Sequence, residues 1–179
     1  MEPFRSVRGG GVKAVLAASE AELLRNLVAQ LMDLIEPESA RAADLDELEM
    51  LLQAEATSTP TDPVLARLLP DGYRDDPDSA GEFRKYTELS LRAAKHESAQ
   101  AMLGSLPEQG GKLHLNADQA QAWLKSLNDV RLALGTKLGV TEDFEDQWDK
   151  LGQDDPRRTA FEVYAWLGAV QESLVRALW

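Results

Sequence analysis

The dipeptide Asp-Pro occurs three times in this 179-residue chain, at positions 62–63, 76–77 and 155–156. This pair is typical of a helix start, because the aspartate carboxylate accepts hydrogen bonds from free N–H groups of the first turn and proline has no N–H to leave unpaired. Apolar residues at helical spacing follow each pair. We therefore predict a short helix that ends at Pro70, a long helix over about 79–103, and a terminal helix that reaches Leu178.

Apolar residues repeated every three or four positions predict further helices in the N-terminal third. Ser19 and Glu22 have the spacing of a capping box, and the apolar stripe after them continues to Ile35, just before Pro37. A second helix is expected over about 40–55.

The C-terminal half contains two more helix signals. Asn116 is expected to cap a helix that ends near Gly139, and Thr141 to cap a short helix after it. Trp123 and Trp148 fall on the apolar faces of these two helices, so both are predicted to lie in the core.

Two short segments have the pattern of β-strands. Residues 4–16 predict a hairpin, because alternating residues flank Gly9, Gly10 and Gly11, and glycine adopts the positive φ angles of a tight reversal. Residues 112–115 form an extended piece that can pair with this hairpin.

The sequence thus predicts a mainly α-helical fold. We expect a single helical domain over residues 1–179, with six or seven helices and a short N-terminal β-hairpin. Residues 1–16 would form the hairpin arm, and 57–61 and 70–78 flexible loops.

The chain has 31 acidic and 19 basic residues, a net charge of −12 at pH 7. This balance disfavours a general affinity for nucleic acid or anionic membranes, since both require clustered lysine and arginine. The excess is concentrated in residues 36–62 and 141–155. These acids are either solvated helix faces or a surface for a basic protein partner. The candidate partner contacts are Asp143, Glu145, Asp146 and Asp149.

No local motif indicates catalysis or a bound cofactor. The chain has no cysteine, which excludes thiol nucleophiles, cysteine metal sites and cysteine redox switches. His96 begins a zinc-protease pattern, but Gln100 stands where the second histidine is needed. The hydrolase elbow, the dinucleotide-binding glycines and the calcium loop are all missing from the sequence. We predict a non-enzymatic protein without catalytic residues, metal or cofactor; an enzyme with an unrecognised carboxylate site is one alternative.

Two helices offer further candidate contacts. Arg84, Glu88, Arg92 and His96 share one face of the long helix, and Arg84 and Arg92 are its candidate partner-binding residues. A DNA-binding factor that uses this face or the basic hairpin is a second alternative, disfavoured by the net charge. The terminal helix is apolar on more than one face, which favours a homodimer contact, and Trp179 at its end is a candidate for a partner contact.

Five segments carry a family resemblance: the Phe4-Arg5 strand with its glycine turn, Ser19–Arg25, Asp62–Pro70, Glu82–Arg84 and Trp123–Gly135. In this order they resemble an actinobacterial family catalogued as a domain of unknown function, whose members include actinomycete oxidative stress regulators. The resemblance implies a cytoplasmic regulator that affects transcription by binding proteins such as a stress sigma factor. A cysteine switch associated with the family cannot operate here, because the chain has no cysteine. No membrane association is expected, since no stretch reaches the roughly 18 apolar residues of a membrane span.

Overall fold

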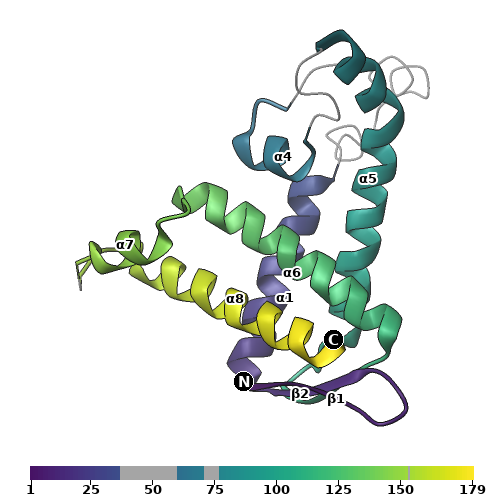
Figure 1. The fold of residues 1–179 in the computed structure, drawn as a ribbon, viewed down its shortest axis with the longest axis vertical. Helices are drawn as coiled ribbons and strands as arrows, with labels where there is room; N and C mark the ends of the chain where they lie inside the picture. Colours follow the sequence, from purple (N-terminus) through teal and green to yellow (C-terminus); the bar gives the residue numbers. More distant parts are fainter. Residues whose placement is uncertain (37–59, 71–76, 153) are drawn as a thin grey trace.

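Figure 1 shows a computed structural model of the protein, a set of helices with a small sheet beside the N-terminus. It describes residues 1–36, 60–70, 77–152 and 154–179, with the backbone alone at 77–86 and 145. The predicted helix over 40–55 and most of the predicted loops at 57–61 and 70–78 lie outside these ranges; of the second loop, residues 77 and 78 belong to a helix. The described elements are β1 (Glu2–Ser6), β2 (Val12–Leu16), α1 (Ala18–Ile35), α4 (Pro63–Leu68), α5 (Pro77–Ser105), β3 (Gly111–Leu115), α6 (Ala117–Leu138), α7 (Phe144–Asp149) and α8 (Arg158–Leu178). The predicted mainly helical fold is confirmed.

The sheet has three antiparallel strands in the order β1-β2-β3. The hairpin between β1 and β2 turns through Gly9, Gly10 and Gly11, whose φ angles of 98°, 107° and 81° are rare for other residues. β3 pairs with β2 along its whole length, from Leu115 opposite Val12 to Gly111 opposite Leu16. Both the hairpin and its pairing with residues 112–115 are confirmed.

Two helix starts lie where the sequence predicts them. Asp62 begins α4, and its Oδ1 accepts a hydrogen bond from the N–H of Val64 at 2.7 Å. Asn116 begins α6, and its Oδ1 accepts from the N–H of Gln119 at 2.8 Å while Gln119 Oε1 accepts from the N–H of Asn116 at 3.0 Å. Gly139 ends α6 in the left-handed conformation, with φ 65°. These ends are set by local hydrogen bonds, which explains why the sequence locates them.

The predicted capping box of Ser19 and Glu22 is wrong. The N-cap is Ala17, so Ser19 lies inside the first turn of α1. Glu20 supplies the carboxylate instead, and its Oε2 accepts a hydrogen bond from the N–H of Ala17 at 2.7 Å. The start is displaced because β2 ends at Leu16 and the chain passes from strand to helix within one residue. At its other end α1 stops before Pro37, as predicted.

The starts of the last two helices also differ from the prediction. Thr141 does not cap α7, which begins at Phe144 with Asp143 at its N-cap. The side chain of Asp155 caps a turn, not α8 itself: its Oδ1 accepts from the N–H of Arg157 at 2.9 Å. This turn delays α8 until Arg158. In α5 the helix is two residues longer at each end than the predicted 79–103.

The helices pack as two crossed pairs above the inner face of the sheet (Figure 1). α1 runs beside α5, and α6 beside α8. Trp123 of α6 is fully buried at the centre, as predicted, with its ring 5.8 Å from the ring of Phe4 in an edge-on arrangement. Its Nε1 donates to Ser105 Oγ at 2.7 Å, which satisfies the one polar atom of the ring. Trp148, by contrast, is only half-buried, because the short α7 lies at the periphery and Arg158 covers its ring.

Candidate functional site: a basic sheet face

Side chains alternate between the core and the outer side along β2 and most of β3, and Phe4 is the one buried side chain of β1, so the sheet has an apolar inner face and a polar outer face. The inner side chains join the core: Phe4, Val12, Ala14, Leu16, Leu113 and Leu115. The exposed outer side chains include Arg5, Lys13, Lys112 and His114, which we call the basic sheet face. The apolar core therefore determines which way these four basic side chains point.

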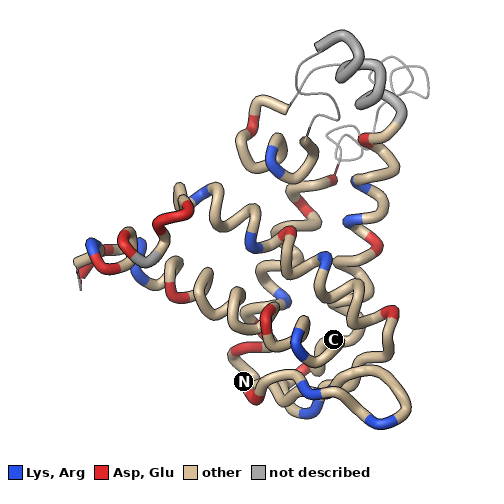
Figure 2. Tube along the Cα trace, in the orientation of Figure 1, with Lys and Arg blue, Asp and Glu red and all other residues tan. Residues whose placement is uncertain are grey.

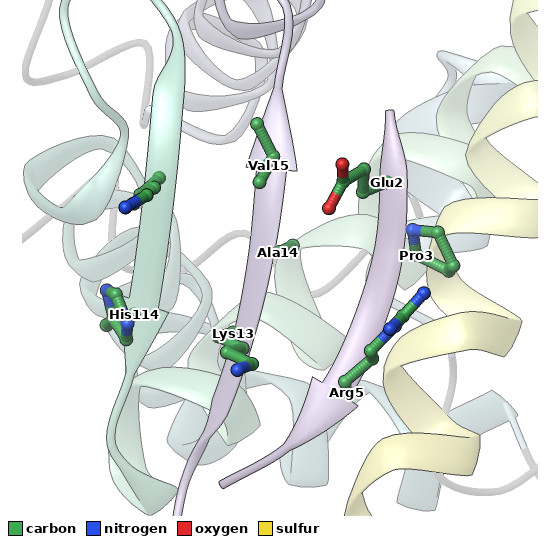
Figure 3. Close-up of a pocket in the computed structure, with 8 residues that line it drawn as sticks. Glu2, Pro3, Arg5, Lys13, Ala14, Val15 and His114 are labelled. Atoms are coloured by element: carbon green, nitrogen blue, oxygen red, sulfur yellow. The ribbon is translucent and has the colours of Figure 1, made fainter.

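The register of the strands places these residues in adjacent rows (Figure 3). Arg5 is opposite Lys13, and Lys13 is opposite His114, so one row crosses all three strands. Lys112 is opposite Val15 in the next row. Since neighbouring strands are about 4.8 Å apart, the row of three extends over roughly 10 Å.

The charges of this face are not balanced by neighbours. Directly opposite like charges destabilise a pair of strands, yet Arg5 and Lys13 occupy opposed positions. In the part of the chain that the structure describes, Arg5, Lys13 and Lys112 form no ion pair. Glu2 is the one carboxylate among the residues that line this surface. On a chain of net charge −12, this is a local basic surface free to meet an anionic group.

The same residues line a shallow hollow of about 310 Å³, shown in Figure 3. Glu2, Pro3, Ala14 and Val15 line it together with the four basic side chains. Ammonium and guanidinium groups on flexible stems can bind carboxylates or phosphates. Over the described ranges, no group of three or more histidine, aspartate or glutamate residues is arranged to hold a metal ion.

The predicted acidic contacts lie at a different end of the molecule. Asp143, Asp146 and Asp149 are exposed around α7, which Figure 2 shows far from the sheet; the side chain of Glu145 lies outside the description. The stacking of Phe144 on Phe161, with ring centroids 5.9 Å apart, attaches α7 to α8. The structure thus brings three of the four predicted acids to one exposed end. Their role in partner binding stays a prediction.

Arg92 has a structural contact that sequence reasoning did not anticipate. Its Nη1 donates to the carbonyl oxygen of Ile35 at 2.7 Å, and its Nε donates to Glu88 at 2.9 Å. The side chain is only 13% exposed. Arg92 therefore holds the C-terminal end of α1 against α5, because the last carbonyls of a helix lack partners within it. For Arg84 the structure describes the backbone alone, so its predicted partner contact stays a prediction.

Trp179 is 83% exposed at the end of α8, and Val175 one turn earlier is 40% exposed. The opposite side of α8 is buried through residues such as Leu167 and Leu174. The predicted homodimer contact on this helix stays a prediction. None of the described helices is apolar over a length that would cross a bilayer.

Sequence reasoning noted the basic hairpin but missed its extension by Lys112 and His114 into a basic sheet face, although the signal was present. Lys13 stands between apolar residues in one predicted strand, and His114 stands between leucines in the other extended piece. Alternation in each segment points the polar residues to one face. Only the pairing of β2 with β3, about 100 positions apart in the sequence, joins the two sets.

Comparisons with known proteins identify relatives of this chain. A family model described as a domain of unknown function (DUF2017) matches residues 1–178. A protein of Mycobacterium leprae (strain TN), named a putative oxidative stress regulator, AosR, is 35% identical over 188 aligned positions, covering 97% of this chain and 85% of the relative. The oxidative stress regulator AosR of Mycobacterium tuberculosis (strain ATCC 25618 / H37Rv) is 35% identical, covering 95% of this chain and 83% of the relative. No solved structure matches the chain.

Proposed function

Since the chain belongs to the DUF2017 family, whose relatives in mycobacteria are named oxidative stress regulators, we propose that it is a cytoplasmic, non-enzymatic regulator of a stress response. It acts by binding an acidic region of another protein on the basic sheet face. The partner is a component of transcription, such as a sigma factor, which is the class that the family resemblance implies. Because the chain has no cysteine, it receives its signal by a route other than thiol oxidation.

The observation that carries this proposal is the group of unpaired cations on an otherwise acidic protein. Arg5, Lys13 and Lys112 are held on one three-stranded sheet, and Arg8 is exposed in the adjoining turn. A preorganised basic surface favours an acidic partner and repels basic ones. The remaining negative charge disfavours the long polyanions to which basic proteins bind without specificity.

The proposal is tested by reversing charge on the face. We expect Lys13→Glu with Lys112→Glu to abolish capture of a specific partner from a native lysate, and wild-type capture to weaken as salt rises. The matched control is Lys137→Glu with Lys150→Glu, the same charge change on exposed residues at the C-terminal end of α6 and at the C-cap of α7. Quantitative mass spectrometry of the captured proteins is the measurement. An identical set of proteins on wild type and the Lys13/Lys112 variant would refute the proposed face.

DNA is the second candidate ligand, because the same cations can bind phosphates. With three or four cations on the face, the dependence of affinity on salt would be shallow, with a log–log slope of roughly −3. A gel-shift titration with duplex DNA at several salt concentrations measures this slope. Binding that survives the Lys13→Glu and Lys112→Glu changes would place any DNA contact elsewhere.

A further inference from the structure

The two edges of the sheet are in different states. The β1 edge is covered by α8, and the N–H of Phe4 donates to Ser173 Oγ there at 3.4 Å. β3 forms the other edge, and its ladder is with β2 alone. Among the described residues, no hydrogen bond connects the outer edge of β3 to any other segment.

The register shows which backbone groups face outward. In an antiparallel pair, alternate residues direct both N–H and C=O towards the neighbouring strand, and those between direct them away. A β-carbon added at Gly11 would collide with the carbonyl oxygen of Leu115, so Leu115 directs its carbonyl towards β2. Leu113 and Gly111 then do the same. Lys112 and His114 therefore present their N–H and C=O groups at the free edge.

These two residues also carry exposed side chains on the basic sheet face. An added strand would lie about 4.8 Å from β3, with alternate side chains beside Lys112 and His114. Carboxylates at those positions would form favourable cross-strand pairs. Backbone pairing and charge complementarity thus select the same ligand.

We propose that β3 receives an extended acidic segment of a partner protein as a fourth strand. The segment pairs with the backbone of Lys112 and His114 and carries Asp or Glu at alternate positions, beside the basic sheet face. This inference rests on the proposed function, because it specifies the form in which the acidic partner binds. Strand addition to an open sheet edge is an established way of binding peptides, with the main chain supplying affinity and alternate side chains supplying specificity.

Other occupants fit this edge less well. A second copy of β3 would bring its own Lys112 onto the same face as Lys13 and Lys112, and like charges close together across paired strands are unfavourable. Nucleic acid offers phosphates but no ladder of amide groups for the free N–H and C=O groups. An acidic extended peptide satisfies both the backbone and the charge.

The test uses a fluorescein-labelled heptapeptide with glutamate at positions 2, 4 and 6 and valine or threonine between, measured by fluorescence anisotropy. Two N-methylated versions keep the charge. One carries methyl groups on residues whose N–H would face β3, the other on the alternate residues. The peptide methylated on the facing residues should bind at least about tenfold more weakly than the other, because at least two backbone hydrogen bonds are lost.

The protein offers a matched pair of variants at His114. His114→Pro removes the edge N–H without touching the ladder to β2, whereas His114→Thr removes only the imidazole. We expect the proline variant to bind the parent peptide roughly tenfold more weakly than the threonine variant. Far-UV circular dichroism of both variants identifies any loss of fold.

The possible outcomes separate this inference from the proposed function. If both methylated peptides bind equally and Lys13→Glu with Lys112→Glu weakens both, charge alone binds the ligand and the added strand is refuted, while the proposed function stands. If the parent peptide does not bind at low salt, the added strand and the proposed acidic partner are both refuted. If a single-stranded DNA of twelve nucleotides binds more tightly than the peptide, the face belongs to nucleic acid and the inference is overturned.

Discussion

Lys95 of α5 and Asp129 of α6 form an ion pair inside the helical layer, with Nζ 2.6 Å from Oδ1. The side chains are 15% and 6% exposed, so both charges are largely removed from water. Such pairs are costly to break and add little net stability, because desolvation offsets the attraction between the charges. The pair joins α5 to α6, so it belongs to the packing of the helices.

The first prediction concerns the removal of one partner or both. Lys95→Met should lower the free energy of unfolding by roughly 3 kcal/mol, because Asp129 is left buried without its cation. The double variant Lys95→Met with Asp129→Leu should be within about 1 kcal/mol of wild type or more stable. Urea unfolding of the two single variants and the double variant measures the coupling. Equal losses in the single and double variants would contradict the argument.

The second prediction is a pH dependence with a definite sign. Burial of the carboxyl raises the pKa of Asp129 above its ordinary value of 3.8, and the hydrogen bond and charge of Lys95 only partly oppose this. The folded state therefore binds the proton more tightly than the unfolded state. The contribution of Asp129 to stability is fully present below pH 3.8 and is lost as the pH rises through the folded-state pKa.

Asp129→Asn is the reference for this measurement, because the amide does not titrate. The free energy of unfolding of wild type, relative to this variant, should fall as the pH is raised from 3.8. Chemical unfolding at a series of pH values tests the sign. A relative stability that increases over this range would mean that Lys95 outweighs the burial.

The third prediction concerns Gly110, which lies where the chain enters β3. Its φ is +74°, and an added β-carbon would be 2.6 Å from the backbone nitrogen of Ala18. Gly110→Ala should therefore lower the free energy of unfolding by about 2 kcal/mol or more, since backbone has to move. Gly104→Ala is the control: Gly104 is helical with open space around it and should gain about 0.5–1 kcal/mol. Thermal unfolding of both variants should show shifts of opposite sign.

The fourth prediction separates a structural arginine from a surface one. Arg92 and Arg176 each pair with a glutamate four residues earlier, but only Arg92 also donates to a helix-end carbonyl, that of Ile35. Arg92→Gln should cost about 1.5–3 kcal/mol, the range for a hydrogen bond to a charged group. Arg176→Gln should change stability by less than about 0.5 kcal/mol, because its side chain is 77% exposed. Similar losses in both variants would argue against the role assigned to Arg92.

Local signals in the sequence located much of the secondary structure. Asp62 and Asn116 begin helices and Gly139 ends one where predicted, because each acts through hydrogen bonds or backbone angles within a few residues. The prediction failed at Ser19, where a good local capping pattern lost to the short connection from β2. It also failed for Trp148, because an apolar helix face does not show how close to the centre its helix will pack.

The candidate site was less accessible from the sequence. Of the seven residues predicted to contact partners, Arg92 is engaged in holding α1, and the three described acids gather around α7. The basic sheet face depends on strand register, which sets Lys13 beside His114. A shift of one residue would have turned these side chains to the core face.

The sequence by itself determined the helical class, the glycine hairpin, the absence of thiol chemistry and the acidic net charge, because these depend on composition and on contacts within one turn. Only the tertiary structure decided that Arg5, Lys13, Lys112 and His114 share one surface, and that one edge of their sheet is covered while the other is open. The physical reason is that strand pairing and helix packing join residues far apart in the chain, and their geometry follows from how the whole apolar core closes.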